Sequence, residues 1–332
     1  MASHIGRRKF LATLGGAAAA WPLAARAQHP TMPVIGWLSS GSRDTDDTIR
    51  LPPFRLGLNE TGYSEGRNVA IEYRRAEDQI ERLPALAADL AHRQVSLILA
   101  AGSPACALAA KSVTTSIPIV FNNAGDPVQL GLVASLNRPG RNVTGVTTVS
   151  AELEAKRLGL LRELVPSAKS IAVLVNPSRP GVNVQLAQAQ QAARVLRLPL
   201  HILEASTERD LDAVFVTLVQ LRAGALMITA DGLFADHLDQ IATLARRYSV
   251  PAMFQFRQFA AAGGLMSYGS GFGQSYHQAG ILTGRILKGE KPADLPVMQP
   301  TKFELVINMR TAKTLGIDVP ISMQMLADEV IE

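Results

Sequence analysis

Short apolar runs alternate along most of the chain with longer segments of helical periodicity. Runs without polar alternation are typical of strands covered on both faces; they lie at 33–38, 95–101, 119–121, 170–175 and 225–229. Segments with apolar residues three and four positions apart predict helices; they include 80–93, 152–164 and 210–222. Because strands and helices alternate, the pattern predicts mostly parallel sheets covered by helices.

Further elements follow from the same periodicity and from Gly and Pro positions. The run at 128–136 is predicted to be a helix, broken by Asn137-Arg138-Pro139-Gly140. A single long helix is predicted at 234–248, and another at 273–288 that ends at Gly289. A Pro-rich connector at 291–300 then leads to a strand at 303–307 and a short helix at 310–315.

One pattern occurs twice. The segment Ile117-Pro118-Ile119-Val120-Phe121 is echoed by Val250-Pro251-Ala252-Met253-Phe254, and both are followed by a Gly-bearing segment and a β-like run. The matching order of elements predicts two similar α/β units that face each other. Asp126 and Asp231 are expected to follow equivalent strands of these units, which makes them the leading candidates for ligand contacts.

Length and composition fit two compact domains. The chain has 332 residues, of which 47% are hydrophobic and 18% charged, so two cores are expected and disorder is not. Arg7-Arg8-Lys9, an Ala/Gly-rich stretch and Ala25-Arg26-Ala27 predict a twin-arginine (Tat-like) export signal at 1–27, cleaved near Ala27. Four of the 33 basic residues lie in this segment, which leaves 29 basic against 28 acidic residues and no sign of nucleic-acid binding.

The sequence lacks the residue patterns of common catalysts. There is no phosphate-binding G-x-x-x-x-G-K-[ST], no G-x-S-x-G and no H-E-x-x-H motif, and the six His are scattered. Cys106, in a run of small residues, is expected to be buried and unreactive. We therefore expect no metal, no cofactor and no enzyme activity. A secreted two-lobed enzyme acting on a small polar metabolite is kept as the alternative.

Small polar residues gather where the predicted strands end. Such loops are where open α/β sheets bind ligands; each residue alone is more typical of a turn or a cap, so it is their joint placement that indicates a site. Hydroxyls, amides and two carboxylates collected in one cleft could hold a small zwitterion. The candidates are Ser39, Ser40, Gly102, Ser103, Asn123, Asp126, Asn176, Asp231 and Tyr268.

Several stretches together resemble the ABC transporter substrate-binding proteins of the type I periplasmic-binding fold, a group with tryptophan- and tyrosine-binding members. They include VIGWLSSGS from Val34, IPIVFNNAGDPVQLGLVASLNRPGRNVTGVT from Ile117 and GRILKGEKPADLPVMQPTKFELVINMRTAKTLG from Gly284. The resemblance implies two Rossmann-like three-layer α/β/α lobes joined by a hinge of several crossings. The first lobe would comprise 28–148 with 270–299, and the second 149–269 with 300–332.

The same resemblance implies a function. We expect a periplasmic, monomeric protein that captures an amino acid, an aromatic or a related organic acid by hinge closure. Its expected partners are the permease and ATPase subunits of an importer at the inner membrane. Carried over by position, Thr147 and Thr148 of the first crossing join the predicted cleft residues. Related proteins often have Ser-Asp there, so a carboxylate for an ammonium group is absent and organic acids stay open as ligands.

Overall fold

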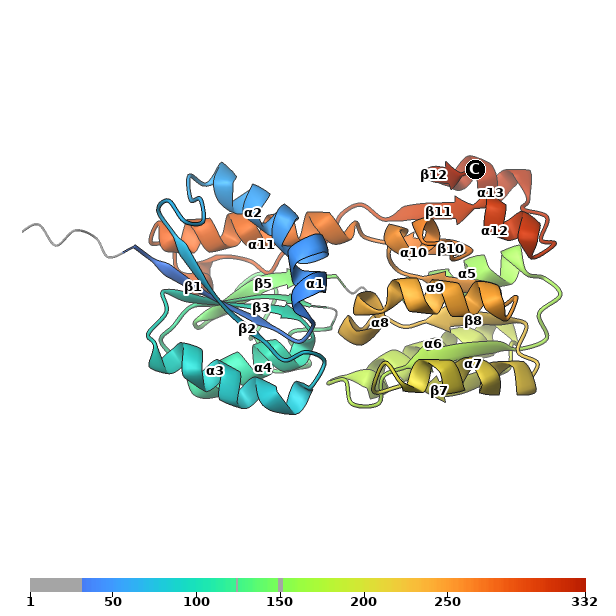
Figure 1. Cartoon of the computed structure of the whole chain (residues 1–332), viewed down its shortest axis with the longest axis horizontal. Coiled ribbons are helices and arrows are strands. Elements are labelled where there is room, and N and C mark those ends of the chain that lie inside the picture. The colour runs from blue at the N-terminus through green and yellow to red at the C-terminus, as the bar shows by residue number, and fades with distance from the viewer. Residues whose placement is uncertain (1–31, 124, 149–151) are drawn as a thin grey trace, which may run out of the picture.

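The protein forms two lobes side by side, each built on its own sheet (Figure 1). The computed structural model describes residues 32–123, 125–148 and 152–332. The predicted export signal at 1–27 and residue 149, the last of the predicted first crossing at 143–149, lie outside the described residues.

The first lobe has a five-stranded parallel sheet in the order β2-β1-β3-β4-β5. Its strands are β1 Val34–Ser39, β2 Ala70–Arg75, β3 Leu97–Gly102, β4 Ile119–Asn123 and β5 Val143–Thr147. Its helices are α1 Arg43–Thr45, α2 Leu51–Glu60, α3 Leu83–His92, α4 Pro104–Val113 and α11 Phe272–Leu287, with a π-helical turn Asp46–Arg50 and 3₁₀ turns Ile80–Arg82 and Pro292–Asp294.

Apolar side chains cover both faces of this sheet, as the absence of polar alternation predicts. Ile98 and Phe121 pack with residues of α3 and α4 on one face. Trp37 and Leu99 pack with residues of α2 and α11 on the other. Figure 1 shows these two helix pairs above and below the sheet.

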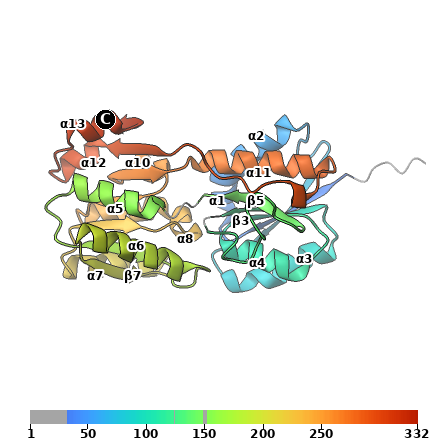
Figure 2. The same ribbon diagram turned by 180° about the vertical axis from the view of Figure 1, so that it is seen from behind.

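The second lobe has seven strands in the order β12-β11-β10-β9-β8-β6-β7, and its neighbouring strands pair in parallel except β10 with β11. The strands are β6 Ile171–Val175, β7 Leu200–Glu204, β8 Ala225–Ile228, β9 Ala252–Phe254, β10 Met266–Gly269, β11 Glu304–Asn308 and β12 Glu329–Ile331. The helices are α5 Glu152–Leu164, α6 Val182–Leu196, α7 Asp210–Gln220, α8 Gly232–Asp236, α9 Leu238–Arg247, α10 Arg257–Ala261, α12 Met309–Thr314 and α13 Ile321–Leu326. Helices α7 and α9 lie on the near face in Figure 1, whereas α5 and α6 lie on the near face in the reversed view of Figure 2.

The internal repeat is confirmed by the strand orders. The series β7-β6-β8-β9-β10 of the second sheet repeats β2-β1-β3-β4-β5 of the first, so that β4 and β9, which carry the echoed segments, are equivalent. The chain passes between the sheets after β5, after β10 and before β11. The backbone N–H of Met298 donates to Gly145 O at 2.8 Å, and that of Thr147 to Met298 O at 3.0 Å, which ties two of these passages together.

The predicted pair of α/β/α lobes with several crossings is thus confirmed, while the lobe limits at 148, 269 and 299 stay a prediction.

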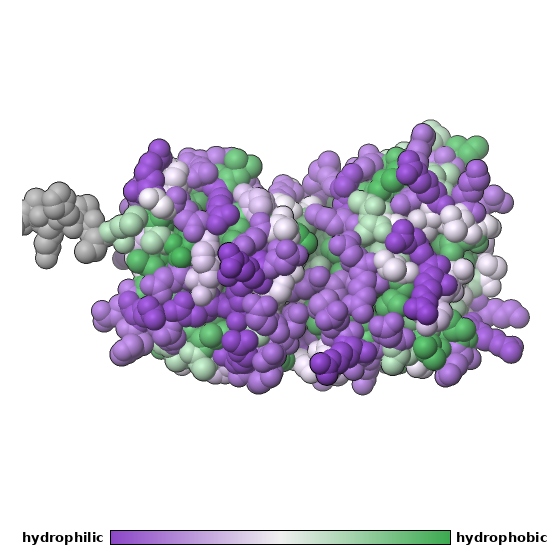
Figure 3. Space-filling model, in the orientation of Figure 1, coloured by the Kyte–Doolittle hydropathy of each residue, from purple (hydrophilic) through white to green (hydrophobic). Residues whose placement is uncertain are grey.

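Figure 3 shows mainly hydrophilic residues on the face drawn there, including the seam between the lobes.

Two predicted helices are wrong. Residues 128–136 form turns instead: the Asp126 carboxylate accepts from the N–H groups of Val128 and Gln129, and Gly131, with φ of +67°, ends the turn. The predicted helix at 234–248 is two helices, α8 and α9, divided at His237. Asp236 and His237 at this break both contact the first lobe, a tertiary interaction that helical periodicity does not reveal.

Candidate functional site

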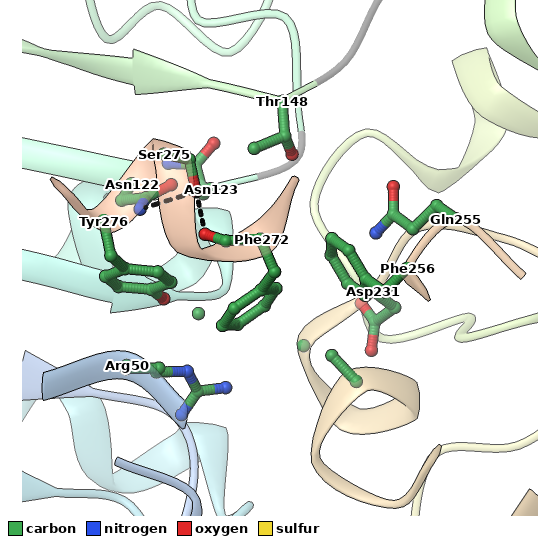
Figure 4. A pocket seen from close by; sticks show the side chains of 13 residues that line it. Arg50, Asn122, Asn123, Thr148, Asp231, Gln255, Phe256, Phe272, Ser275 and Tyr276 are labelled. Atoms are coloured by element: carbon green, nitrogen blue, oxygen red, sulfur yellow. Dashed lines mark hydrogen bonds between the residues drawn. The ribbon is translucent and has the colours of Figure 1, made fainter. Parts of the chain in front are cut away.

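A small cavity lies between the lobes, where the carboxyl ends of both sheets' strands meet (Figure 4). The first lobe contributes residues from the ends of β3, β4 and β5, from the π-helical turn and from α11. The second contributes residues that follow β8 and β9. The lining residues are Arg50, Gly102, Asn122, Asn123, Thr148, Asp231, Gly232, Ala235, Gln255, Phe256, Phe272, Ser275 and Tyr276.

Three aromatic rings form one wall of the cavity. Phe272 of the first lobe meets Phe256 of the second edge to face, with ring centroids 4.6 Å apart. The ring of Tyr276, which lies one helical turn after Phe272, has its centroid 5.1 Å from that of Phe272 and also stacks on the buried ring of Trp37. Offset and edge-to-face pairs at these distances are favourable geometries for aromatic rings. The wall is therefore shared by both lobes and is suited to contact a flat apolar ligand.

Amides and hydroxyls line another part of the cavity. The Asn122 side chain donates from Nδ2 to Ser275 Oγ at 3.2 Å, and Ser275 Oγ donates to Phe272 O (Figure 4). Asn123 is 3% exposed, and within the described part of the chain neither atom of its side-chain amide has a hydrogen-bond partner. Gln255 lines the cavity from the second lobe. Its position matches Asn122, because Phe121 and Phe254 close the two echoed segments.

A buried ion cluster lies beside the cavity in the first lobe. Arg50 Nη1 donates to Asp46 Oδ1 at 2.9 Å, and Arg75 Nε to Asp46 Oδ2 at 2.9 Å. Trp37 Nε1 also donates to Asp46, at 2.8 Å, and Arg50 Nη2 pairs with Asp236 of the second lobe. Burial alone would lower the pKa of Arg50, but the two carboxylates outweigh it and raise this pKa. Burial raises the pKa of Asp236 to about 7, although Arg50 opposes the shift.

A second ion pair crosses the cleft next to the first. His237 Nε2 lies 3.1 Å from Asp78 Oδ2. Burial lowers the pKa of His237, yet the hydrogen bond and the charge of Asp78 outweigh it and raise the pKa. The two lobes also come into close contact at Gly102 and Gly232. A Cβ atom added to Gly232 would lie only 3.3 Å from the carbonyl group of Gly102, and Gly102 has a φ of +91°, which favours glycine. The structure therefore has its lobes closed on each other.

On the second lobe's side, Asp231 is the N-cap of α8. Its carboxylate accepts from Leu233 N at 2.9 Å and from Asn176 Nδ2 at 3.0 Å, and lies 3.6 Å from Arg179 Nε. Burial raises the pKa of Asp231 and lowers that of Arg179, and in each case the partner's charge opposes the shift. The charge of Asp231 is thus already balanced by the protein.

The predicted site residues fall into groups. The cavity brings together Gly102, Asn123, Thr148 and Asp231. A second hollow shares Asp231 with it and is also lined by Ser40, Ser103 and Asn176. A third, larger hollow is lined by Asp126 and Thr147, among others.

Two predicted residues line none of these three spaces. Ser39 lies beneath the ion cluster, where its hydroxyl donates to Asp46 Oδ1 at 2.9 Å. The Tyr268 carbonyl accepts from Arg157 Nε at 2.8 Å.

The expected equivalence of Asp126 and Asp231 is wrong. Asp231 follows β8, whose counterpart is β3, so its equivalent in the first lobe is Ser103. Both residues cap the helix that follows: Ser103 Oγ accepts from Ala105 N at 3.2 Å. Asp126 follows β4, the counterpart of β9. The small residues at the ends of β3 and β8 therefore indicate which strands of the two lobes are equivalent, and the two carboxylates do not.

Sequence reasoning missed most residues of the aromatic wall and of the ion cluster. Arg50, Phe272, Ser275 and Tyr276 lie in helical segments, where no strand-end signal marks them. The residues Asn122, Gln255 and Phe256 could have been predicted to line the site, because they directly follow the echoed segments.

Metal sites, membrane spans and reactive thiols each set requirements that the described residues can be compared with. None of its His, Cys, Asp and Glu residues form a group of three or more able to hold a metal ion, and none of its helices is long and apolar enough to cross a membrane. Cys106 is buried, as predicted, and burial raises the pKa of its thiol to about 12. A thiol with such a pKa is a weak nucleophile near neutral pH.

Comparison with known proteins adds to this geometry. A family model described as ABC transporter substrate binding protein matches residues 46–331. The chain is 28% identical over 262 residues to a tyrosine-binding protein of Clostridioides difficile strain R20291, which covers 79% of this chain and 75% of that protein.

Two solved structures share the fold. An ABC domain from Streptococcus pneumoniae in complex with L-Trp is 24% identical, with a TM-score of 0.81 over 90% of this chain and 99% of the other. The ligand-free, open structure of a substrate binding protein with adhesive properties from Clostridium difficile is 27% identical, with a TM-score of 0.61 over 87% and 96%.

Proposed function

The chain belongs to the family of ABC transporter substrate-binding proteins, and from this premise we propose that it captures a small aromatic solute between its lobes. The class includes aromatic amino acids and other small aromatic compounds. The observation that carries the proposal is the wall of Phe256, Phe272 and Tyr276, which both lobes build and which faces amides and hydroxyls. A flat ring gains apolar burial and aromatic contacts there, while its polar end finds hydrogen bonds.

Closure supplies the means of capture. Phe272 is on the first lobe and Phe256 on the second, so the wall is complete only when the lobes meet. The three passages between the sheets allow a hinge motion that opens and closes it. The names of two similar proteins, one tyrosine-binding and one solved with L-Trp, support an aromatic ligand.

The setting of this activity is also part of the proposal. The Tat-like segment at 1–27 supports export to the periplasm and cleavage near Ala27. There the protein acts as a monomer and hands its solute, chemically unchanged, to permease and ATPase subunits at the inner membrane. Family membership and a closable cleft support this delivery role.

A thermal-shift and calorimetric screen tests the proposal. The purified protein is titrated with L-tyrosine, L-tryptophan, aromatic acids and aromatic amides, with sugars and aliphatic amino acids as controls. A ligand at a hundred times its Kd stabilises the folded state by about 2.7 kcal/mol. We expect an aromatic hit that is recovered unchanged. Binding of sugars or aliphatic compounds alone would exclude the aromatic class, and consumption of the hit would establish an enzyme instead.

A further inference from the structure

The charged groups of the cavity already have counter-ions or hydrogen-bond partners within the protein, whereas one of its neutral amides has none among the described residues. Arg50 has Asp46 and Asp236 as counter-ions, and Asp231 has Arg179 and Asn176. The Asn123 amide, by contrast, is 97% buried and has no partner for Nδ2 or Oδ1 within the described residues. The hydrogen-bonding capacity left open in the cavity is therefore mainly that of an uncharged donor and acceptor.

An unpartnered buried amide is unfavourable, because it has lost its hydrogen bonds to water without replacing them. Asn123 lies at the carboxyl end of β4 and lines the cavity. A ligand that offers one acceptor and one donor together would satisfy both atoms of the amide. Gln255, 4% exposed, brings a second amide to the same cavity from the opposite lobe.

Resting on the function proposed above, we infer that the cavity selects aromatic solutes whose polar end is an uncharged donor and acceptor edge, such as a carboxamide. Asn123 of the first lobe and Gln255 of the second recognise this edge, and the aromatic wall holds the ring. If the aromatic class is wrong, this inference fails with it. The matched probes below separate the two failures.

A charged polar end fits this cavity less well. A ligand carboxylate near Arg50 would also approach Asp46 and Asp236, which already neutralise that arginine. A ligand ammonium would find Asp231 engaged with Arg179, and the first crossing offers Thr148 rather than a carboxylate. Buried charges without free counter-ions are strongly disfavoured. Arg50 Nε, which also lacks a partner in the described chain, remains as a donor for a neutral carbonyl oxygen.

Matched probe pairs test the inference. Calorimetry measures the Kd of the purified protein for benzamide against benzoate and for indole-3-acetamide against indole-3-acetate, with L-tryptophan alongside. We expect each amide that binds to do so at least tenfold more tightly than its carboxylate. Equal or tighter binding of a carboxylate or of L-tryptophan overturns the inference and leaves the aromatic function standing. Absence of binding by every aromatic probe overturns both.

Variants then assign the recognition to Asn123. Asn123→Asp keeps the shape but replaces the donor by a negative charge, and Asn123→Leu removes both hydrogen bonds. Each is expected to weaken amide binding at least tenfold. Asn183→Asp makes the same charge change at an exposed position of α6 and is expected to leave the Kd unchanged. Unaltered affinity in Asn123→Leu overturns the inference. If neither Asn123 variant folds, Gln255→Leu gives the deciding measurement.

Discussion

The two lobes have the same strand order but place different groups at equivalent strand ends. Strand β4 ends with Asn122 and Asn123, whereas β9 is followed by Gln255 and Phe256. After β3 comes Ser103, and after β8 comes Asp231. The repeated part builds the sheets, and the positions where the copies differ supply the cavity with an amide from one side and a ring from the other. Recognition in this protein is thus a property of the asymmetry between the lobes.

The largest effects are expected at two buried arginines, one at the contact between the lobes and one inside the second lobe. Arg50 pairs with Asp236 across the cleft, whereas Arg157 pairs with Glu154 and the Tyr268 carbonyl within the second lobe. Removing one partner of a buried ion pair typically destabilises a protein by about 3–5 kcal/mol. Both Arg50→Met and Arg157→Met are therefore expected to lower the free energy of unfolding by about this amount in urea titrations.

Only Arg50→Met should change the arrangement of the lobes. Small-angle scattering of the ligand-free variants is expected to show a larger radius of gyration for Arg50→Met than for Arg157→Met. If the two variants have the same radius, the pair that Arg50 makes with Asp236 does not hold the lobes together.

The aromatic wall gives the next largest effect. Phe256 packs between Phe254 of its own lobe and Phe272 of the other. Truncating a buried Phe to Ala typically destabilises by about 3–5 kcal/mol. Phe256 lies at the surface between the lobes, where small movements of the lobes can fill the space left by the missing ring. We therefore expect Phe256→Ala to destabilise the protein by an amount near the lower end of this range, and calorimetry should show loss of aromatic binding. Phe215→Ala, in the core of the second lobe, should destabilise similarly yet leave affinity intact.

Proton uptake on closure is a smaller and reversible effect. In the closed structure the pKa of Asp236 is raised from 3.8 to about 7, with Arg50, Asp78, Asp46 and His237 as its charged neighbours. The pKa of His237, which faces Asp78, Glu208 and Asp236, is raised above 6.5. Both groups bind protons more tightly in the closed structure, Asp236 because it is buried and His237 because Asp78 outweighs the effect of burial, so their stabilising effect is present at low pH. It is lost as the pH rises, between about 4 and 7 for Asp236 and above 6.5 for His237.

Scattering at two pH values measures this coupling. The ligand-free protein is expected to be more compact at pH 6 than at pH 8. The double variant Asp236→Asn, His237→Gln should show no such difference, whereas Asp239→Asn, at an exposed position of α9, should retain it. A pH dependence that survives in the double variant would assign it to other groups.

The sheets could be predicted from the sequence because their signal is local. Apolar runs marked the strands, and the echo of 117–121 at 250–254 predicted the repeat that the strand orders confirm. Strand-end position alone also brought Asn123 and Asp231 into the predicted site. The rest depended on contacts distant in sequence. Nothing near Arg50 indicates that Asp236, 186 residues away, is its partner, and the helix break at His237 was equally hidden.

The two helix caps are expected to show the smallest effect and the clearest difference in role. Ser103→Ala removes only the hydrogen bond to Ala105 N, so it should lower the free energy of unfolding by about 1 kcal/mol. Asp231→Ala removes a cap and also the buried carboxylate that accepts from Asn176 and lies beside Arg179, so urea titration should show a larger loss. Ser112→Ala, at an exposed position near the other end of α4, should stay within about 0.5 kcal/mol of the parent. Equal losses for Ser103→Ala and Asp231→Ala would mean that Asp231 acts only as a cap, and that the second lobe differs from the first at this position in residue type alone.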